Sequence, residues 1–278
     1  SVSNAVARMR HNWKDPLFVK QGRGVRATPF AVALWQQVAE PLTLISSAVA
    51  PVAFEAQTAH ARFRIALTDG MAAVIWPELR KIIESVAPNI DIHAVPYKMD
   101  GDALLMNADV DLVFDYFPET SQFANLSQHI RQQAMFENRF VCVMNPQHRL
   151  ANKTLTLEDF VTAEHLLVSL SGDASGVVDS TLANLGQKRR ISMTVNSFAS
   201  GINLIKQSQL ISSLPYPIVA EAHLANELVI KSLPISVPPA KITMAWHRRD
   251  DHSLGLRWLR DTLSGIIDVK RALLEVVV

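Results

Sequence analysis

The apolar positions of the first 13 residues recur at helical spacing, at Val2, Val6, Met9 and Trp13. The opposite face of that helix is polar and basic, and it carries Ser1, Asn4, Arg8 and His11. A helix of this length cannot bury such a stripe by itself, so we expect it to have a packing partner. The pattern predicts a surface helix with one packed face and one face available for contacts.

A hairpin is predicted directly after this helix. Asp15-Pro16 ends the helical pattern, and LFVK and VRA are short strand-like runs separated by the turn QGRG. Gly22 and Gly24 allow the turn to adopt positive φ angles. Basic side chains extend from the predicted hairpin tip and its second strand.

The segment 29–50 has apolar residues at near-heptad spacing, which are Phe30, Leu34, Val38, Leu42, Ile45 and Val49. Pro29 stands at its start, where a missing N–H costs least. Pro51 follows its end, and Pro41 lies inside and is expected to bend or break the helix. A narrow apolar stripe of this kind is typical of a helix that pairs with a copy of itself.

From residue 61 onward, strand-like and helix-like runs alternate, which predicts an α/β fold with βαβ units and mainly parallel sheets. The predicted strands are 63–69, 90–97, 110–116, 138–145, 165–171, 190–195, 210–215, 227–234 and 241–249. The predicted helices are 71–88, 101–107, 156–163, 176–186, 197–207 and 253–274.

Charge is distributed unevenly along the 278 residues, although the net charge is only +1. Residues 1–30 carry six basic side chains against Asp15 alone, a net charge of +5, whereas the remainder is mildly acidic at −4. A basic head on an acidic body is typical of a protein that contacts a polyanion. The single cysteine, Cys142, excludes an internal disulfide, and no signal peptide or long apolar run is visible, so we expect a cytoplasmic location.

The opening motifs SNAVARMR, DPLFV, GRG and TP strongly resemble the LysR-type transcriptional regulators of bacteria, closest to the LeuO and NodD-like branch. The resemblance covers the whole chain and implies about two further helices upstream of residue 1. It implies a winged helix-turn-helix over 1–28, a linker and dimerisation helix over 29–51, and an effector domain over 52–278. The implied partners are double-stranded DNA and further copies of the chain, as homodimers and homotetramers.

The effector domain of this family resembles a type-II periplasmic binding protein with a ligand cleft at its hinge. The resemblance places 61–141 and 241–278 in lobe I and 142–240 in lobe II. The chain is therefore expected to cross between the lobes near Val143 and near Pro239. A small-molecule effector is implied as a further partner, and no cofactor is expected.

We expect residues 1–28 to contact DNA. By analogy with the family, Ser3 and Asn4 fall at positions of the recognition helix that contact bases, and an asparagine amide can bridge adenine N6 and N7. The basic residues and Thr28 are better suited to phosphates or the minor groove. The full predicted set is Ser1, Ser3, Asn4, Arg8, Lys20, Arg23, Arg26 and Thr28.

Effector contacts are predicted where strands end, because ligands of open parallel sheets lie beyond the carboxyl ends of the strands. The residues at these ends are Thr68, Asp69, Gly70, Asp115, Tyr116, Ser169, Ser171 and Asn196. Since Ser, Thr, Asp and Asn are also ordinary helix N-caps, a purely capping role is the competing interpretation.

No catalytic motif or metal-ligand cluster is visible in the sequence, so neither catalytic nor metal-binding residues are predicted. His247 and His252 have no cysteines near them, and Cys142 is expected to be a small core residue. The serious alternative on fold alone is a secreted solute-binding protein. That class would carry a secretion signal and would lack a basic hairpin, and this chain has the reverse.

Overall fold

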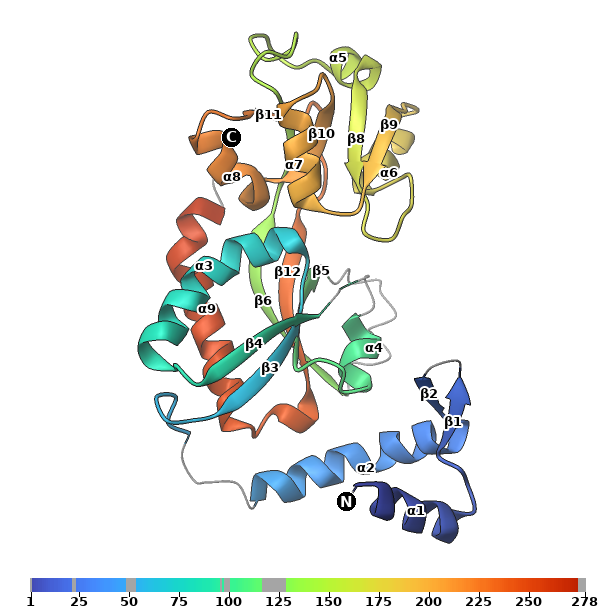
Figure 1. Ribbon diagram of the computed structural model, residues 1–278. Coiled ribbons are helices and arrows are strands. Elements are labelled where there is room, and N and C mark those ends of the chain that lie inside the picture. Colours follow the sequence, from blue (N-terminus) through green and yellow to red (C-terminus); the bar gives the residue numbers. More distant parts are fainter. Residues whose placement is uncertain are drawn as a thin grey trace. The chain divides into compact units, whose positions relative to one another are not determined.

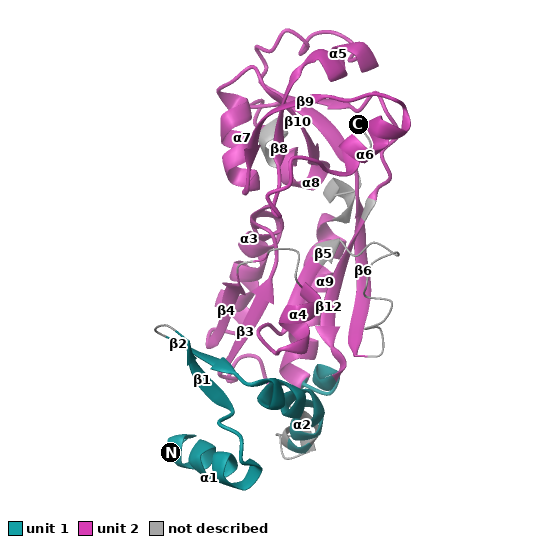
Figure 2. Ribbon diagram, turned by 90° about the vertical axis from the view of Figure 1, so that its right-hand side faces the viewer, with its two compact units in different colours: residues 1–53, 249–253 teal, residues 54–248, 254–278 magenta. Residues whose placement is uncertain are grey.

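The computed structural model describes residues 2–21, 24–48, 54–95, 97, 101–116 and 129–274. The chain divides into two compact units, drawn in two colours in Figure 2. Unit 1 comprises residues 1–53 with 249–253, and unit 2 comprises residues 54–248 with 254–278. None of the described helices is both long and apolar enough to span a membrane.

Unit 1 contains α1 (Val2–Trp13), the antiparallel strands β1 (Phe18–Gln21) and β2 (Gly24–Ala27), and α2 (Pro29–Ala48) (Figure 1). Asp15 organises the connection between them. Its Oδ1 accepts hydrogen bonds from the Leu17 N–H and the Thr28 hydroxyl, both at 2.7 Å. The Thr28 oxygen in turn accepts from the Ala31 N–H at 3.1 Å and caps α2. One carboxylate therefore ties the hairpin to the start of the long helix.

The helix α2 runs through Pro41 without a break, so of the two predicted effects of this proline, a bend or a break, the break does not occur. Large apolar side chains along it stay exposed, including Trp35 (40%), Leu42 (51%) and Ile45 (62%). Val49, the last position of the predicted stripe, lies outside the described residues. Exposed apolar side chains of this size favour association of α2 with another apolar surface, because association removes them from water.

Lobe I of unit 2 is a five-stranded sheet in the order β4-β3-β5-β12-β6. Its strands are β3 (Ala61–Ala66), β4 (Ile90–Val95), β5 (Leu112–Tyr116), β6 (Ile130–Asn138) and β12 (Ala240–His247). Its helices are α3 (Asp69–Val86), α4 (Gly101–Met106) and α9 (Leu254–Leu274). The helices α3 and α9 pack on one face of the sheet, around Ile65, Ile75, Phe114 and Leu259. The short α4 covers the other face through Leu105.

Lobe II is a second five-stranded sheet in the order β11-β7-β10-β8-β9. Its strands are β7 (Phe140–Met144), β8 (Glu164–Val168), β9 (Arg190–Val195), β10 (Ile211–Pro215) and β11 (Val229–Ser232). Its helices are α5 (Leu157–Thr162), α6 (Val177–Asn184), α7 (Phe198–Lys206) and α8 (Tyr216–Leu224).

The strand β7 shows why this sheet is covered on both faces. Val141 and Val143 point into the core that includes α7 and α8, whereas Cys142 and Met144 point into the core that includes α5 and α6. Successive side chains of a strand alternate between faces, so a continuous apolar run fits a strand buried on both sides.

Three features differ from the sequence expectation. Both sheets are mixed rather than mainly parallel, because β12 runs antiparallel to β5 and β6, and β7 antiparallel to β10 and β11. The chain enters lobe II between Asn138 and Phe140, ahead of the predicted crossing at Val143, and returns to lobe I between β11 and β12. The strand β6 and the helix α8 were not predicted, because neither 130–137 nor 216–224 shows a clear periodicity.

Candidate functional site

The N-terminus of α3 in lobe I contacts the N-terminus of α7 in lobe II. The Asp69 carboxylate accepts hydrogen bonds from the Ser197 hydroxyl (2.8 Å) and from the backbone N–H groups of Phe198 (3.2 Å) and Ala199 (3.0 Å). A carboxylate at this end of a helix satisfies free N–H groups and opposes the positive end of the helix dipole. Asp69 therefore forms a polar contact between the lobes.

Gly70 brings the two lobes into close apolar contact beside Asp69. A Cβ at this position would lie 2.6 Å from Ile218 Cδ1 and 3.0 Å from the Phe198 ring. A side chain at this position would require Ile218 and the Phe198 ring to shift. The predicted ligand contacts at Asp69 and Gly70 thus lie against lobe II, and both are engaged within the protein.

A pocket of about 260 Å³ lies in lobe II, at the carboxyl ends of β8 and β10. Its apolar walls include Phe140, Leu167, Val178 and Phe198, and its polar lining consists of serine hydroxyls and one guanidinium. The serines are Ser169, Ser171, Ser175 and Ser213, and the guanidinium belongs to Arg189. An apolar cavity with a few convergent polar groups is the usual form of a small-molecule site.

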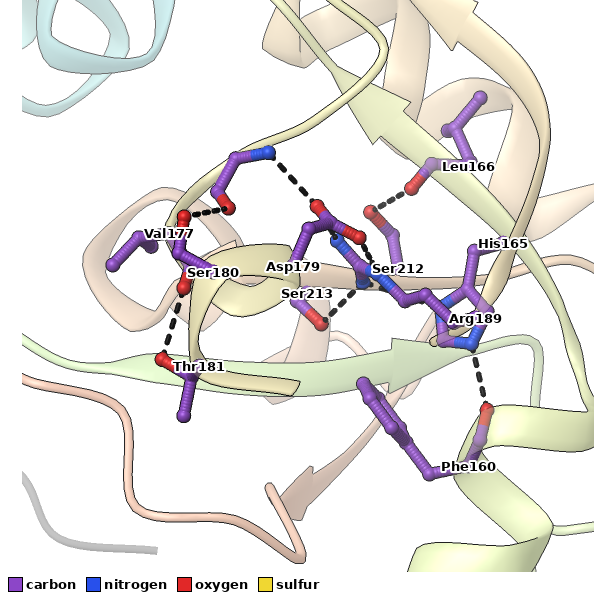
Figure 3. Close-up of polar contacts among 11 residues, drawn as sticks. Phe160, His165, Leu166, Val177, Asp179, Ser180, Thr181, Arg189, Ser212 and Ser213 are labelled. Carbon is purple, nitrogen blue, oxygen red and sulfur yellow. Dashed lines mark hydrogen bonds and ion pairs between the residues drawn. The ribbon is translucent and has the colours of Figure 1, made fainter. Parts of the chain in front are cut away.

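Beneath this pocket lies a buried polar network centred on Arg189 (Figure 3). Its Nε and Nη2 donate to the two oxygens of Asp179 at 2.8 and 2.9 Å, and its Nη1 donates to the Ser213 Oγ at 3.1 Å. The second Asp179 oxygen also accepts from the Gly176 N–H at 2.8 Å, at the start of α6. The Arg189 side chain is only 1% exposed, so its charge depends on this two-pronged pairing.

The network also determines the protonation state of His165, which is fully buried. Its Nε2 donates to the Phe160 carbonyl at 2.7 Å, and its Nδ1 accepts from Arg189 Nη1 at 3.3 Å. Both contacts require the neutral ring, and burial lowers the pKa of His165 to about 4. His165 is therefore uncharged, and its ring bridges the Arg189 guanidinium and the Phe160 carbonyl on α5.

Burial raises the pKa of Asp179, but the hydrogen bonds and the charge of Arg189 outweigh it and leave that pKa below its ordinary value. Burial also raises the pKa of the nearby Cys142 thiol to about 12, which leaves it protonated and unreactive. No group of His, Cys, Asp or Glu in the described part of the chain is arranged to hold a metal ion.

The second candidate surface is in unit 1. Ser3, Asn4 and Arg8 are exposed on α1, and no described residue of that helix is buried. Lys20 and Arg26 are exposed on the hairpin, where Lys20 pairs with Val25 and Arg26 with Val19. Because paired residues share a face, Lys20 and Arg26 project from opposite faces of the hairpin.

Two predicted DNA contacts, Ser1 and Arg23, lie outside the described residues. Thr28 has a role different from the predicted one, since it is buried and its hydroxyl joins Asp15 to α2. A group committed in this way is not available to a phosphate.

The predicted effector residues do not form one cluster. Ser169 and Ser171 line the pocket, whereas Asn196 is exposed and lies outside it. Thr68 caps α3 by accepting from the Met71 N–H at 3.1 Å, as the capping interpretation expects. Asp115 and Tyr116 end the described part of β5, and their side chains lie outside the described set.

The network of His165, Asp179, Arg189 and Ser213 was not predicted from the sequence. These residues lie far apart in the chain, and only the pairing of β8 with β9 and β10 brings them together. The one available signal was Asp179 near the start of the predicted helix, three residues after Gly176, where a carboxylate commonly bonds back to the residue before the helix.

Residues 56–265 match the sequence pattern of the LysR substrate binding domain. The chain is 28% identical to the HTH-type transcriptional activator NahR of Pseudomonas putida, covering 95% of this chain and 86% of NahR. It is 30% identical to nodulation protein D 2 of Sinorhizobium fredii, covering 95% of this chain and 83% of that protein. A solved probable transcriptional regulator from Pseudomonas aeruginosa superposes with a TM-score of 0.67 at 24% identity, over 95% of this chain and 86% of that one.

The depressed pKa of His165 gives a testable pH dependence. Between its ordinary pKa and about 4 the unfolded chain binds a proton that the folded chain does not, so stability falls as pH decreases through this window. We expect His165 to account for a loss of about 1 kcal/mol per pH unit in the free energy of unfolding between pH 6.5 and 4.5. Urea unfolding of the wild type and of His165→Gln at several pH values measures this contribution.

The exposed His11→Gln variant is the control and should follow the wild-type pH dependence. If His165→Gln loses stability with acid as steeply as the wild type does, the buried histidine is not the group responsible.

Proposed function

The chain belongs to the LysR family of transcriptional regulators and carries its effector-binding domain, and from this premise we propose how its residues divide the work. Unit 1 binds double-stranded DNA, α2 joins two copies of the chain, and the lobe II pocket holds a small-molecule effector. The relatives are regulators rather than enzymes, so we assign no catalytic residue. We place the protein in the bacterial cytoplasm, associated with the nucleoid when it is bound to DNA.

The proposal that unit 1 binds DNA rests on the exposed polar face of α1. Ser3 and Asn4 are free to contact base edges near the start of that helix, and Arg8 lies one turn further along. Lys20 and Arg26 on the two faces of the hairpin are placed to contact phosphates on either side of a groove.

The exposed stripe of α2 supports self-association. Leu34 and Val38 are partly exposed and Leu42 and Ile45 are strongly exposed, which is too much apolar surface for a helix that stays alone in water. We propose that this stripe pairs with its copy in a homodimer and that homodimers associate further as homotetramers. A dimer would place two α1 helices on two half-sites related by a two-fold axis.

The pocket and the contact between the lobes share Phe198, which supports an effector-dependent response. The Phe198 ring lines the pocket, and the Phe198 N–H donates to Asp69 in lobe I. A ligand seated against this ring changes the energy of the inter-lobe contact, and a ligand can shift a conformational equilibrium only through such differential contacts. We propose that lobe I moves on lobe II about the two crossing strands.

DNA affinity should depend steeply on salt. Each side chain that neutralises a phosphate contributes roughly −0.9 to the slope of log affinity against log salt concentration. We expect Lys20→Ala combined with Arg26→Ala to make that slope less negative by about 2 and to weaken all DNA sequences alike. Titration of labelled DNA at several salt concentrations measures the slope.

Arg80→Ala is the matched control for these two substitutions, because Arg80 is an exposed basic residue of unit 2 that pairs with Glu84. It should leave the slope unchanged. A loss of affinity confined to one operator would mean that the hairpin contacts bases.

Asn4 is expected to contact a base. A bidentate contact from its amide to adenine is worth about 1–3 kcal/mol of discrimination. Asn4→Ala should therefore lose preference at one A·T base pair in each half-site, while binding to unrelated DNA persists through the basic residues. Affinities for a series of single-base operator variants at fixed salt measure the effect.

Asn12→Ala on the same helix is the control and should keep the wild-type base preference. An equal loss on every operator variant would assign Asn4 to the phosphate backbone instead.

The dimer can be tested on α2. Leu34→Asp places a charge on the proposed paired stripe, where its burial without a partner costs several kcal/mol. Sedimentation should show a smaller species whose unit 2 remains folded. Gln37→Asp, at an exposed polar position of the same helix, should keep the wild-type assembly, and an unchanged assembly in Leu34→Asp would assign the interface to another surface.

A further inference from the structure

Two of the electropositive groups beside the lobe II pocket are already engaged by carboxylates of the chain itself, namely the Arg189 guanidinium and the start of α7. Asp179 takes both the Arg189 guanidinium and the Gly176 N–H at the start of α6. Asp69 takes the Phe198 and Ala199 N–H groups at the start of α7. An anion that entered the pocket would therefore find these partners already engaged, and it would have to share the Arg189 guanidinium with Asp179.

The polar groups that remain for a ligand are uncharged hydroxyls. Ser169 is buried, lines the pocket, and has no hydrogen-bond partner for its hydroxyl in the described part of the chain. Ser213 accepts from Arg189, and within the same described residues its own hydroxyl proton is donated to no other group. Both hydroxyls can therefore donate a hydrogen bond to a ligand in the pocket.

The neutral histidine beneath the network adds no positive charge that could offset this balance. Of the described residues that line the pocket, Arg189 alone carries a charge, and its side chain is sealed from solvent by its pairing with Asp179. The remaining wall is aliphatic and aromatic, with Phe140 and Phe198 both contributing.

We infer that the pocket takes an uncharged, ring-sized molecule with a carbonyl or hydroxyl group, which bonds to Ser169 and Ser213, and that it discriminates against carboxylates. This inference rests on the proposed function, because it names the class of effector for the same pocket. Its specificity comes from Asp69 and Asp179, which remove the binding partners that an acid would need.

The test compares ligands that differ only in charge. Benzamide with benzoate and cinnamamide with cinnamate are titrated into the full chain at pH 7, with ligand-detected NMR as the measurement. We expect saturable binding of the amides and at least about tenfold weaker binding of the acids. Ser169→Ala and Ser213→Ala should each weaken amide binding by about three- to tenfold, and the exposed Ser180→Ala on α6 should leave it unchanged.

A gain-of-binding variant keeps the test independent of loss of stability. Asp69→Ala removes an exposed carboxylate and frees the N–H groups at the start of α7, so the affinity for benzoate relative to that for benzamide should rise several-fold. Equal or tighter binding of the acids by the wild type, or no binding of either amide, would overturn the inference.

The outcomes separate this inference from the proposed function. Tight binding of benzoate that is weakened by Ser169→Ala and Ser213→Ala would contradict the inferred class of ligand. It would still support the pocket as the ligand site. Binding of any probe that both serine variants leave unchanged would locate the ligand elsewhere and count against the proposed pocket itself.

Discussion

The Asp179 carboxylate holds together the part of lobe II on which the proposed ligand site depends. It pairs with the Arg189 guanidinium, which is almost completely shielded from water. It also accepts a hydrogen bond from the N–H of Gly176, the residue just before α6. Arg189 in turn bonds to Ser213 on β10 and lies beside His165 on β8. A buried cation without this partner would destabilise the lobe by several kcal/mol, so the network must form whenever the sheet forms.

In the proposal made here for the pocket, the same charges select the ligand. Asp179 inside lobe II and Asp69 across the lobes act in the same manner, because each carboxylate satisfies donors that an anionic ligand would otherwise use. Phe198 lies at the meeting point, with its ring at the pocket and its N–H on Asp69. The proposed link between ligand binding and the contact between the lobes therefore runs through this one residue.

The sequence predicted local elements well and long-range pairing poorly. The hairpin of unit 1 and the strand–helix alternation of unit 2 follow from turn residues and apolar spacing, which act over a few positions. The strand β6 was not predicted, and β12 was predicted as a strand but not as an antiparallel one, because strand direction depends on partners more than 100 residues away in the chain.

The same distinction between local sequence and long-range pairing applies to the residues of the candidate site. Ser169 and Ser171 follow the end of β8 and line the pocket, and their contact with an effector stays a prediction. Thr28 looked like a DNA contact because threonine is common in such contacts, but the carboxylate of Asp15 turns its hydroxyl inward. His165 and Arg189 could not be predicted, since their chemistry arises only where β8, β9 and β10 lie side by side.

The most direct test of the account is a double-mutant cycle on the pair at its centre. Asp179→Asn and Arg189→Gln are made singly and together, and the free energy of unfolding of each is measured in urea. We expect each single change to cost about 3–5 kcal/mol and the double variant to cost clearly less than their sum, because a buried charge is left alone only in the single variants. Additive losses would contradict the account, since they would mean that the two charges do not depend on each other.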